Sequence, residues 1–340
     1  MALIDIKIKK LQLRNTWRIA RNSSDYKENV FIKIQRNGIA GFGEAAPNVR
    51  YGENPQLTIE RIRKAEKIIE NADLFQFTAI KKTLDEEIQD QNCAKAAIDM
   101  AVMDWVGKSL DVPLYKLWGL NPLLAPITSF SIGIDTPDIL KKKIEQTKDF
   151  PILKIKVGKD NEKEIIKAVR SITEKPLRID VNEAWTSKEE ALEKILWMQE
   201  QNIEFIEQPM PADMLQETAW LRERINIPIV ADESVKNVSD IAKLSCAFEG
   251  INIKLMKSGG LVEAIKMIEV AHGLGMKVML GCMIESSLAI TAAAHLSPCI
   301  EWADLDGNLL INNDPFQGVK VENGKLILDD SPGLGVSGDF

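Results

Sequence analysis

The chain has 340 residues, of which 45% are hydrophobic and 27% charged, and a formal net charge of −7. This length suffices for one large or two ordinary domains, and the composition is typical of a soluble globular protein. The negative charge and the lack of a basic block argue against a nucleic-acid partner, and the apolar runs are too short to span a membrane.

The start of the chain and its cysteines bear on where the protein works. The first ten residues, MALIDIKIKK, lack the pattern of a signal peptide, so we expect a cytoplasmic protein. The four cysteines form no CxxC pair, which favours free thiols in a reducing compartment. The two histidines, His272 and His295, are expected to be structural, which argues against a histidine-rich zinc site or a Ser-His-Asp triad.

The first part of the chain predicts an α+β unit. The first 50 residues alternate polar and apolar side chains as strands do, with Asn37-Gly38 as a hairpin turn. Helical periodicity follows over about 57–70 and over 92–108. We therefore expect residues 1–125 to form an α+β domain.

From Pro126 onward, strands and helices alternate. The strand candidates are 127–134, 153–158, 177–182, 204–209, 227–234, 250–255, 277–282 and 302–307. Amphipathic stretches such as 137–147, 187–201 and 259–273 separate them. Strands that alternate with helices are typically parallel, and eight of them predict a closed TIM-type barrel.

The last helix of the barrel is expected to be missing or reduced, because the chain after Leu310 turns polar and rich in glycine. The prediction is therefore a (β/α)7β TIM-type barrel over 126–315, with the tail 316–340 returning to complete the first, capping domain. An open doubly wound sheet is the alternative, but no GxGxxG motif follows a first strand.

Three carboxylates lie where the barrel would carry its active site. Asp180, Glu207 and Asp232 occur at the same depth on three successive strands, and the carboxyl ends of barrel strands meet at one face. Converging anions repel one another unless a cation lies among them. Three carboxylate oxygens, completed by water or substrate, suit Mg²⁺. Alternatively, nearby lysines neutralise the carboxylates in a purely structural network.

Lysines also occur at these strand ends. The stretch LKIKVG places Lys154 and Lys156 on one face of the second strand, and Lys254 ends the sixth. Lys156 and Lys254 are then expected on opposite sides of the barrel, flanking the metal. A lysine beside other cations can act as a base nearer neutral pH. Two such bases on opposite faces of one carbon predict racemisation or epimerisation.

The motifs LKIKVG, RIDVNEAW, EFIEQPM, VADES and INIKLMKSGG resemble, in order and spacing, those of the enolase superfamily, muconate-lactonizing-enzyme subgroup. The resemblance spans nearly the whole chain and includes GFGEAAP of the capping domain. Lysine and Mg²⁺ chemistry is typical of this superfamily. The resemblance implies one Mg²⁺ per subunit on Asp180, Glu207 and Asp232, an acid/base pair of Lys156 and Lys254, and Lys154 as a partner of the substrate carboxylate.

Strand eight narrows the substrate class. The stretch ADLDG supplies Asp304 and Asp306 at i and i+2, and this DxD resembles that of the dipeptide epimerases, where two aspartates hold the ammonium of a dipeptide. The resemblance implies an isomerase that inverts the α-carbon of the C-terminal residue of L-Ala-D/L-Glu or a related dipeptide. It would use two-base 1,1-proton transfer through a Mg²⁺-stabilised enediolate. The alternative is that either aspartate only caps a turn.

The same resemblance assigns the remaining contacts. Ser131 and Glu285 are expected near the substrate, and Arg21, with Arg18 as the alternative, would pair with a glutamyl side chain. Asn182 and Glu233 would support the metal ligands.

Other functions stay open. Within the subgroup these are N-acylamino acid racemase, o-succinylbenzoate synthase and muconate cycloisomerase, whose substrates carry no ammonium. Outside it, a barrel aldolase with a lysine Schiff base and a non-catalytic barrel that binds a metabolite are the alternatives. Family members often assemble, so a homo-oligomer is among the expectations, although no symmetry follows from the sequence.

Overall fold

The computed structural model describes residues 3–20 and 22–340. The chain begins with an antiparallel sheet of β1 (Leu3–Arg18), β2 (Ser23–Arg36) and β3 (Ile39–Ala45), which pair in that order. Asn37 and Gly38 turn the β2–β3 hairpin with φ of 52° and 79°. Asn-Gly favours this left-handed geometry, and the predicted turn is confirmed.

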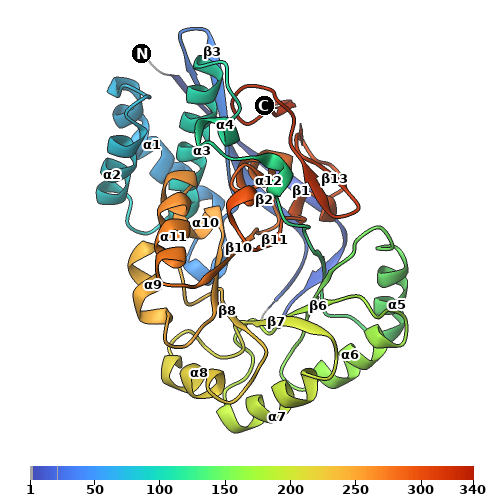
Figure 1. Ribbon diagram of the computed structural model, residues 1–340. Helices are drawn as coiled ribbons and strands as arrows, with labels where there is room; N and C mark the ends of the chain where they lie inside the picture. The colour runs from blue at the N-terminus through green and yellow to red at the C-terminus, as the bar shows by residue number, and fades with distance from the viewer. Residues whose placement is uncertain (1–2, 21) are drawn as a thin grey trace.

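Three helices pack beside this sheet: α1 (Pro55–Asn71), α2 (Phe77–Glu87) and α3 (Asn92–Ser109) (Figure 1). Helix α3 approaches β3 so closely that only glycine fits. A Cβ atom on Gly41 would lie 2.0 Å from the carbonyl oxygen of Ala101, and one on Gly43 would lie 1.9 Å from that of Ala97. The two glycines of GFGEAAP therefore let the sheet rest directly on a buried helix.

The barrel is a single sheet of eight parallel strands in chain order. They are β4 (Phe130–Ile132), β5 (Leu153–Lys156), β6 (Leu177–Asp180), β7 (Ile203–Glu207), β8 (Ile229–Ala231), β9 (Gly250–Ile253), β10 (Lys277–Gly281) and β11 (Trp302–Asp304). The backbone N–H of Ser129 donates to the carbonyl oxygen of Ala303 at 3.1 Å, and Thr128 bridges to Ala303. These contacts between the first and last strands nearly close the barrel.

Helices connect consecutive strands, and those between β4 and β9 lie outside them (Figure 1). The connecting helices are α5 (Pro137–Glu145), α6 (Glu162–Arg170), α7 (Lys188–Met198), α8 (Leu215–Arg222), α9 (Val238–Leu244), α10 (Leu255–Ser258), α11 (Leu261–Gly273) and α12 (Ser287–Ala294). After β11 the only helical element in the described chain is the 3-10 turn Gly307–Leu310. The predicted fold class, a (β/α)7β barrel with an α+β capping domain, is confirmed.

The strands are shorter than predicted at their carboxyl ends. Strand β6 ends at Asp180, and Asn182 and Glu183 then take left-handed φ values of 48° and 67°. The backbone therefore leaves the sheet just after the carboxylate that ends β6. Alternation alone could not show this, because the residues after the strand continue the same pattern.

The tail returns to the first sheet, as predicted. It forms the two pairs β12 (Phe316–Gln317) with β15 (Ser337–Gly338), and β13 (Lys320–Glu322) with β14 (Lys325–Ile327). The ring of Phe316 stacks on Phe31 with centroids 5.8 Å apart. The division of the chain at residues 125 and 316 stays a prediction.

A buried histidine joins the tail to α4 (Leu114–Leu117). The Nδ1 atom of His295 accepts from the backbone N–H of Tyr115 at 3.2 Å, and its Nε2 lies 3.1 Å from the carbonyl oxygen of Leu334. Burial lowers the pKa of His295 to about 4. A neutral ring serves both contacts, so His295 has the structural role that we expected.

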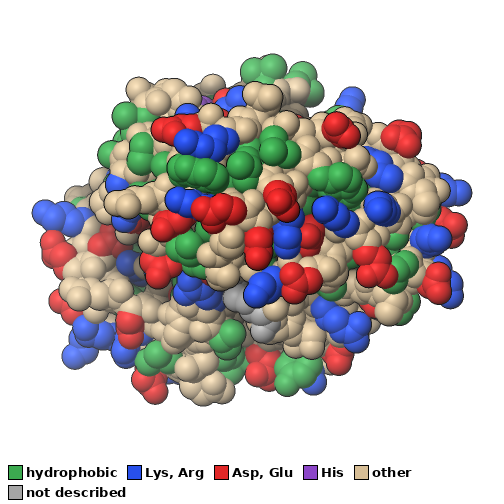
Figure 2. Space-filling model, turned by 90° about the horizontal axis from the view of Figure 1, so that it is seen from below, with side chains coloured by type: hydrophobic (Ala, Val, Ile, Leu, Met, Phe, Trp, Pro, Cys, Tyr) green, Lys and Arg blue, Asp and Glu red, His purple; other side chains and the backbone are tan. Residues whose placement is uncertain are grey.

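The outer surface carries mixed charge on the face seen in Figure 2, where Lys and Arg side chains are interspersed with Asp and Glu. No helix within residues 3–20 and 22–340 is both long enough and apolar enough to cross a membrane. Cys93, Cys246, Cys282 and Cys299 are free thiols.

Candidate active site

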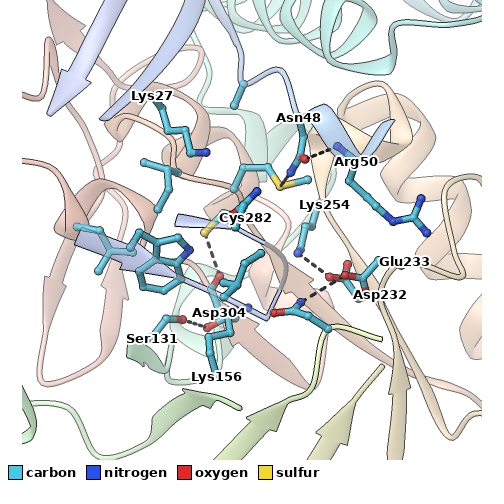
Figure 3. Close-up of a pocket in the computed structure, with 18 of the residues that line it drawn as sticks. Lys27, Asn48, Arg50, Ser131, Lys156, Asp232, Glu233, Lys254, Cys282 and Asp304 are labelled. Carbon is cyan, nitrogen blue, oxygen red and sulfur yellow. Dashed lines mark hydrogen bonds and ion pairs between the residues drawn. The ribbon is translucent and has the colours of Figure 1, made fainter. Parts of the chain in front are cut away.

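A cavity of about 110 Å³ lies between the first sheet and the carboxyl ends of the barrel strands (Figure 3). The barrel side is lined by Ser131, Lys154, Lys156, Asn182, Asp232, Glu233, Lys254, Cys282 and Asp304. The capping side is lined by Trp17, Ile19, Asn22, Lys27, Asn29, Asn48, Arg50 and Tyr51. Most of the residues predicted at the strand ends thus line one cavity that the first domain covers.

Three buried carboxylates converge at this end of the barrel. One oxygen from each of Asp180, Glu207 and Asp232 lies within 4.8 Å of the others. Asp180 and Glu207 are direct neighbours in the register of β6 and β7, and Asp232 follows the end of β8. The Nδ2 of Asn252 donates to Glu207 at 2.7 Å, which orients that carboxylate.

Two lysines reach the carboxylates from different strands. Lys156 on β5 contacts Asp180, and Lys254, just after β9, places its Nζ 2.8 Å from Oδ2 of Asp232. Strands β5 and β9 are separated by β6, β7 and β8 in the sheet order, so they stand on opposite sides of the barrel. Both lysines line the cavity, and they approach it from opposite sides.

Lys154 joins the carboxylates to the last strand. Its Nζ lies 2.6 Å from Oε2 of Glu207, 2.6 Å from Oδ2 of Asp304 and 3.4 Å from Oδ2 of Asp180. Burial acts to lower the pKa of Lys154, but Asp304 and Glu207 outweigh it, and the pKa lies well above the ordinary value. Lys154 therefore stays charged.

Burial and neighbouring charges oppose each other in the carboxylate cluster. Burial acts to raise the pKa of Asp232, but Lys254 and Lys257 hold it well below the ordinary value. The pKa of Glu207 rises to about 7 because of burial and the nearby Asp180. The lysines thus compensate the carboxylates incompletely, and a further cation would be stabilised among them. Three carboxylate oxygens are a donor set that fits Mg²⁺.

Lys257 makes a contact that the sequence did not reveal. Its Nζ donates to Oδ1 and to the carbonyl oxygen of Asp232, both at 2.5 Å, and to the carbonyl oxygen of Asn252 at 3.0 Å. Gln208 holds the same residue from another side, because its Oε1 accepts from the backbone N–H of Asp232 at 2.9 Å. The short helix α10 folds Lys257 back toward Asp232, and strand spacing carries no signal of that turn.

The two aspartates of strand eight have different surroundings. Asp304 lines the cavity and accepts from Oγ of Ser129 at 2.7 Å and from Oγ of Ser131 at 3.1 Å. Burial opposes its charge, but Lys154 lowers the pKa of Asp304 to about 2. Asp306 accepts from the backbone N–H of Ser131 at 2.5 Å, and burial together with Asp304 raises its pKa to about 7.

The remaining barrel residues lie as follows. Asn182 and Glu233 line the cavity, with Nδ2 of Asn182 3.3 Å from Oε1 of Glu233. Glu285 is buried and accepts from the backbone N–H of Met283 at 2.7 Å. Burial and the neighbouring Glu44 raise the pKa of Glu285 to about 8. Its side chain is thus turned toward its own loop.

The predicted arginines and the capping side differ from the barrel side. The Nη1 atom of Arg18 lies 3.3 Å from Oδ1 of Asp135. Arg21 lies outside the described residues, so its predicted contact with the substrate stays a prediction. Arg50 makes a two-pronged contact with Glu183, with both N···O distances 3.0 Å. Sequence reasoning missed Lys27 on β2, because alternation puts it on the same face as Asn29 but does not show that this face lines the cavity.

Comparisons with known proteins agree with this geometry. Residues 1–119 match the family "Mandelate racemase / muconate lactonizing enzyme, N-terminal domain", and residues 140–339 match "Enolase C-terminal domain-like". The chain is 45% identical to an L-Ala-D/L-Glu epimerase of Bacteroides thetaiotaomicron over 327 residues, which cover 96% of this chain and 85% of that protein.

Solved structures with the same fold carry ligands. The dipeptide epimerase of Enterococcus faecalis, complexed with Mg and L-Leu-L-Tyr, superposes with a TM-score of 0.93 at 33% identity over 98% of both chains. A substrate-liganded L-Ala-D/L-Glu epimerase of Bacillus subtilis has a TM-score of 0.93 at 29% identity and covers 99% of this chain and 98% of its own. The chain therefore belongs to the mandelate racemase/muconate lactonizing enzyme family, with an enolase-like C-terminal domain.

Proposed function

We propose that this protein is a Mg²⁺-dependent dipeptide epimerase that inverts the α-carbon of the C-terminal residue. The observation that carries the proposal is the entry of Lys156 and Lys254 into one cavity from opposite sides of the barrel, beside three buried carboxylates. The full-length match to proteins named as dipeptide epimerases supports the same reaction class.

Asp180, Glu207 and Asp232 would hold the Mg²⁺, one ion per subunit. When bound, the ion supplies positive charge to the substrate carboxylate while the α-proton is away from its carbon. Asp180 and Asp232 would then attract Lys156 and Lys254 less strongly, since their charge is shared with a metal. Although burial acts to lower the pKa of Lys254, the attraction of Asp232 raises it; that attraction would weaken, and this amine would become a better base.

The two lysines would divide the proton transfer by face. The Nζ of one lysine removes the α-proton of one epimer, and the ammonium of the other delivers a proton to the opposite face. Because the reaction runs both ways, each lysine is the base for one epimer and the acid for the other. Lys154 stays charged and would stabilise negative charge on the substrate carboxylate.

Asp304 would bind the ammonium of the substrate's N-terminal residue. It is ionised, it lines the cavity, and the hydroxyls of Ser129 and Ser131 hold it in place. A charge-assisted hydrogen bond in a buried site is stronger than a neutral one. Asp306 would hold Ser131 in place by accepting from its backbone N–H. An N-acylated amino acid has no ammonium to pair with Asp304, so a dipeptide complements this part of the cavity better.

Hydrogen exchange tests the proposal. The purified protein is incubated with Mg²⁺ in D₂O with free dipeptides and, separately, with N-succinyl amino acids, and mass spectrometry follows deuterium at the α-carbon. We expect deuterium in the C-terminal residue together with formation of the other epimer. The double variant Lys156→Met/Lys254→Met is the control for non-enzymatic exchange. Exchange in N-succinyl amino acids alone would overturn the dipeptide assignment, and no exchange in either class would overturn the proposal.

We also propose that the enzyme works in the cytoplasm as a homo-oligomer. The free thiols support a reducing compartment. Fractionation of the source cells tests the location, and light scattering of the purified protein at micromolar concentration tests the assembly. A monomer under those conditions would contradict the second part.

A further inference from the structure

Five of the described cavity-lining residues are cations, and they differ in their partners. They are Lys27, Arg50, Lys154, Lys156 and Lys254. The last four each contact a carboxylate of the protein. Lys27 forms no hydrogen bond or ion pair with the residues that the structure describes, and burial is what perturbs its charge. It is therefore the uncommitted cation of this set.

Lys27 also lies in an environment that disfavours an unpaired charge. The side chain is partly buried, and burial lowers the pKa of its ammonium. A partly desolvated ammonium without a counter-ion gains free energy when an anion binds beside it. The capping side of the cavity thus favours binding of a negatively charged group of a ligand.

The position of Lys27 is set by the strand that carries it. Lys27 and Asn29 lie on the same face of β2, because side chains two apart in a strand point the same way. The Nδ2 of Asn29 donates to Glu44 at 2.7 Å and to the carbonyl oxygen of Ile284 at 3.0 Å, which fastens this face to the barrel loop after β10. Figure 3 shows Lys27 on the capping side, away from Lys156 and Asp304.

The reaction geometry then decides which part of the substrate reaches Lys27, and this step rests on the proposed function. The α-carbon has four substituents. Its proton points at one lysine, its carboxylate at the carboxylate cluster with the metal, and its peptide nitrogen toward Asp304. The remaining substituent, the side chain of the C-terminal residue, must extend to the capping side. Ile19 of the capping side, together with Ile284 and Leu310 of the loops after β10 and β11, lines the cavity and can contact its methylene groups.

We propose that Lys27 selects dipeptides with an acidic C-terminal residue by pairing with the side-chain carboxylate. The substrate class is thereby L-Ala-Glu-like rather than hydrophobic or cationic. Lys27 acts on specificity and takes no part in the proton transfer.

The test compares L-Ala-L-Glu with its uncharged isostere L-Ala-L-Gln. The ratio of the two kcat/KM values is measured for the wild type and for Lys27→Met. We expect the wild type to prefer L-Ala-L-Glu and the ratio to fall about 10- to 100-fold in the variant, mostly through KM, as for loss of a charge-assisted hydrogen bond. Lys27→Glu should move the preference toward L-Ala-L-Lys. The matched control is Lys33→Met, on the same strand but outside the cavity and paired with Asp5 at 2.7 Å.

Binding is measured as well, so that the inference does not depend on turnover. Calorimetry of the Mg²⁺-loaded protein should show the same loss of selectivity for L-Ala-L-Glu over L-Ala-L-Gln in Lys27→Met. An unchanged ratio in both assays would overturn the inference, as would its loss in Arg21→Met alone. Absence of exchange with every dipeptide, together with Lys27-dependent binding of L-Ala-L-Glu, would overturn the proposed reaction and leave the inference standing.

Discussion

The barrel side and the capping side of the cavity are built differently. On the barrel side, Lys154 and Asp180 are 1% and 0% exposed, and the charged groups contact one another. On the capping side, the Arg50 side chain is 40% exposed, and Lys27 has no ionic partner among the described residues. A network of mutual contacts can hold reacting groups in place, whereas loosely held charges can respond to different side chains. We infer that the barrel side sets the reaction and that the capping side selects the side chain of the C-terminal residue.

The largest expected effect separates the two bases on the barrel side. Lys156→Met and Lys254→Met should each reduce the rate of epimerisation by roughly 10²- to 10⁴-fold, which is the usual contribution of a general acid or base to the rate. Each variant should still exchange the α-proton of one epimer with solvent, because the other base remains. Deuterium incorporation from pure L,L and pure L,D dipeptide measures this. Equal residual exchange of both epimers in either variant would contradict the division by face.

Removal of a metal ligand comes next. Asp180→Asn should weaken Mg²⁺ binding by roughly 100-fold, because the amide lacks the charge that a hard divalent ion requires. Calorimetric titration of the stripped protein with Mg²⁺ measures the affinity. The matched control is Asp135→Asn, whose carboxylate pairs with Arg18 and Lys143 instead. Wild-type affinity in Asp180→Asn would show that the carboxylates are only partners of the lysines.

The role of Asp304 is isolated by chemistry on the substrate. Acetylation of the amino group of L-Ala-L-Glu should lower kcat/KM by about 10- to 100-fold in the wild type, as loss of a buried charge-assisted contact does. In Asp304→Asn the free and acetylated substrates should become nearly equivalent, since the ammonium has lost its partner. Steady-state kinetics with both substrates on both proteins gives the four kcat/KM values that this comparison needs. If acetylation lowered kcat/KM as much in Asp304→Asn as in the wild type, the ammonium would bind elsewhere.

The barrel and the capping domain also contact each other away from the cavity, where His295, just after α12, binds the tail at Leu334. Its folded pKa of about 4 lies below the unfolded value of about 6.5, so the unfolded chain takes up more protons between these values. The stability that neutral His295 contributes is therefore full above pH 6.5 and is lost as the pH falls toward 4, with about 2 kcal/mol lost by pH 5. Urea unfolding from pH 7.5 to 5 measures it.

The comparison for that measurement is His295→Gln, which cannot titrate. The difference in unfolding free energy between wild type and variant isolates the histidine from carboxylates that also titrate in this range. The difference should shrink as the pH falls from 7.5 to 5. A difference independent of pH would mean that His295 is not held neutral.

The smallest expected effect lies on the capping side. Arg50→Met removes a pair with Glu183 that is partly exposed, and such pairs contribute about 1 kcal/mol or less. The value of kcat/KM should therefore fall by less than about fivefold, and steady-state kinetics with L-Ala-L-Glu measures it. A loss as large as that of the barrel lysines would abolish the distinction between the two sides.

Spacing along the chain was enough to predict the barrel and its carboxylates. Parallel strands put residues of equal depth side by side, so the sequence alone places Asp180 beside Glu207, and their register in β6 and β7 agrees. The same reasoning put Lys156 and Lys254 on opposite sides. These positions depend on local periodicity and on one topological rule.

Contacts between distant segments were decided by the tertiary structure alone. Glu44 of β3 accepts from the backbone N–H and the hydroxyl of Ser286, and so ties the first sheet to the start of α12. The backbone N–H of Ser131 donates to the carboxylate of Asp306, and β2 places Lys27 at the cavity. No spacing encodes how the first domain lies on the barrel, because that orientation results from the packing of whole surfaces. Lys27, the residue proposed to select the C-terminal side chain, could therefore be placed at the cavity only by the tertiary structure.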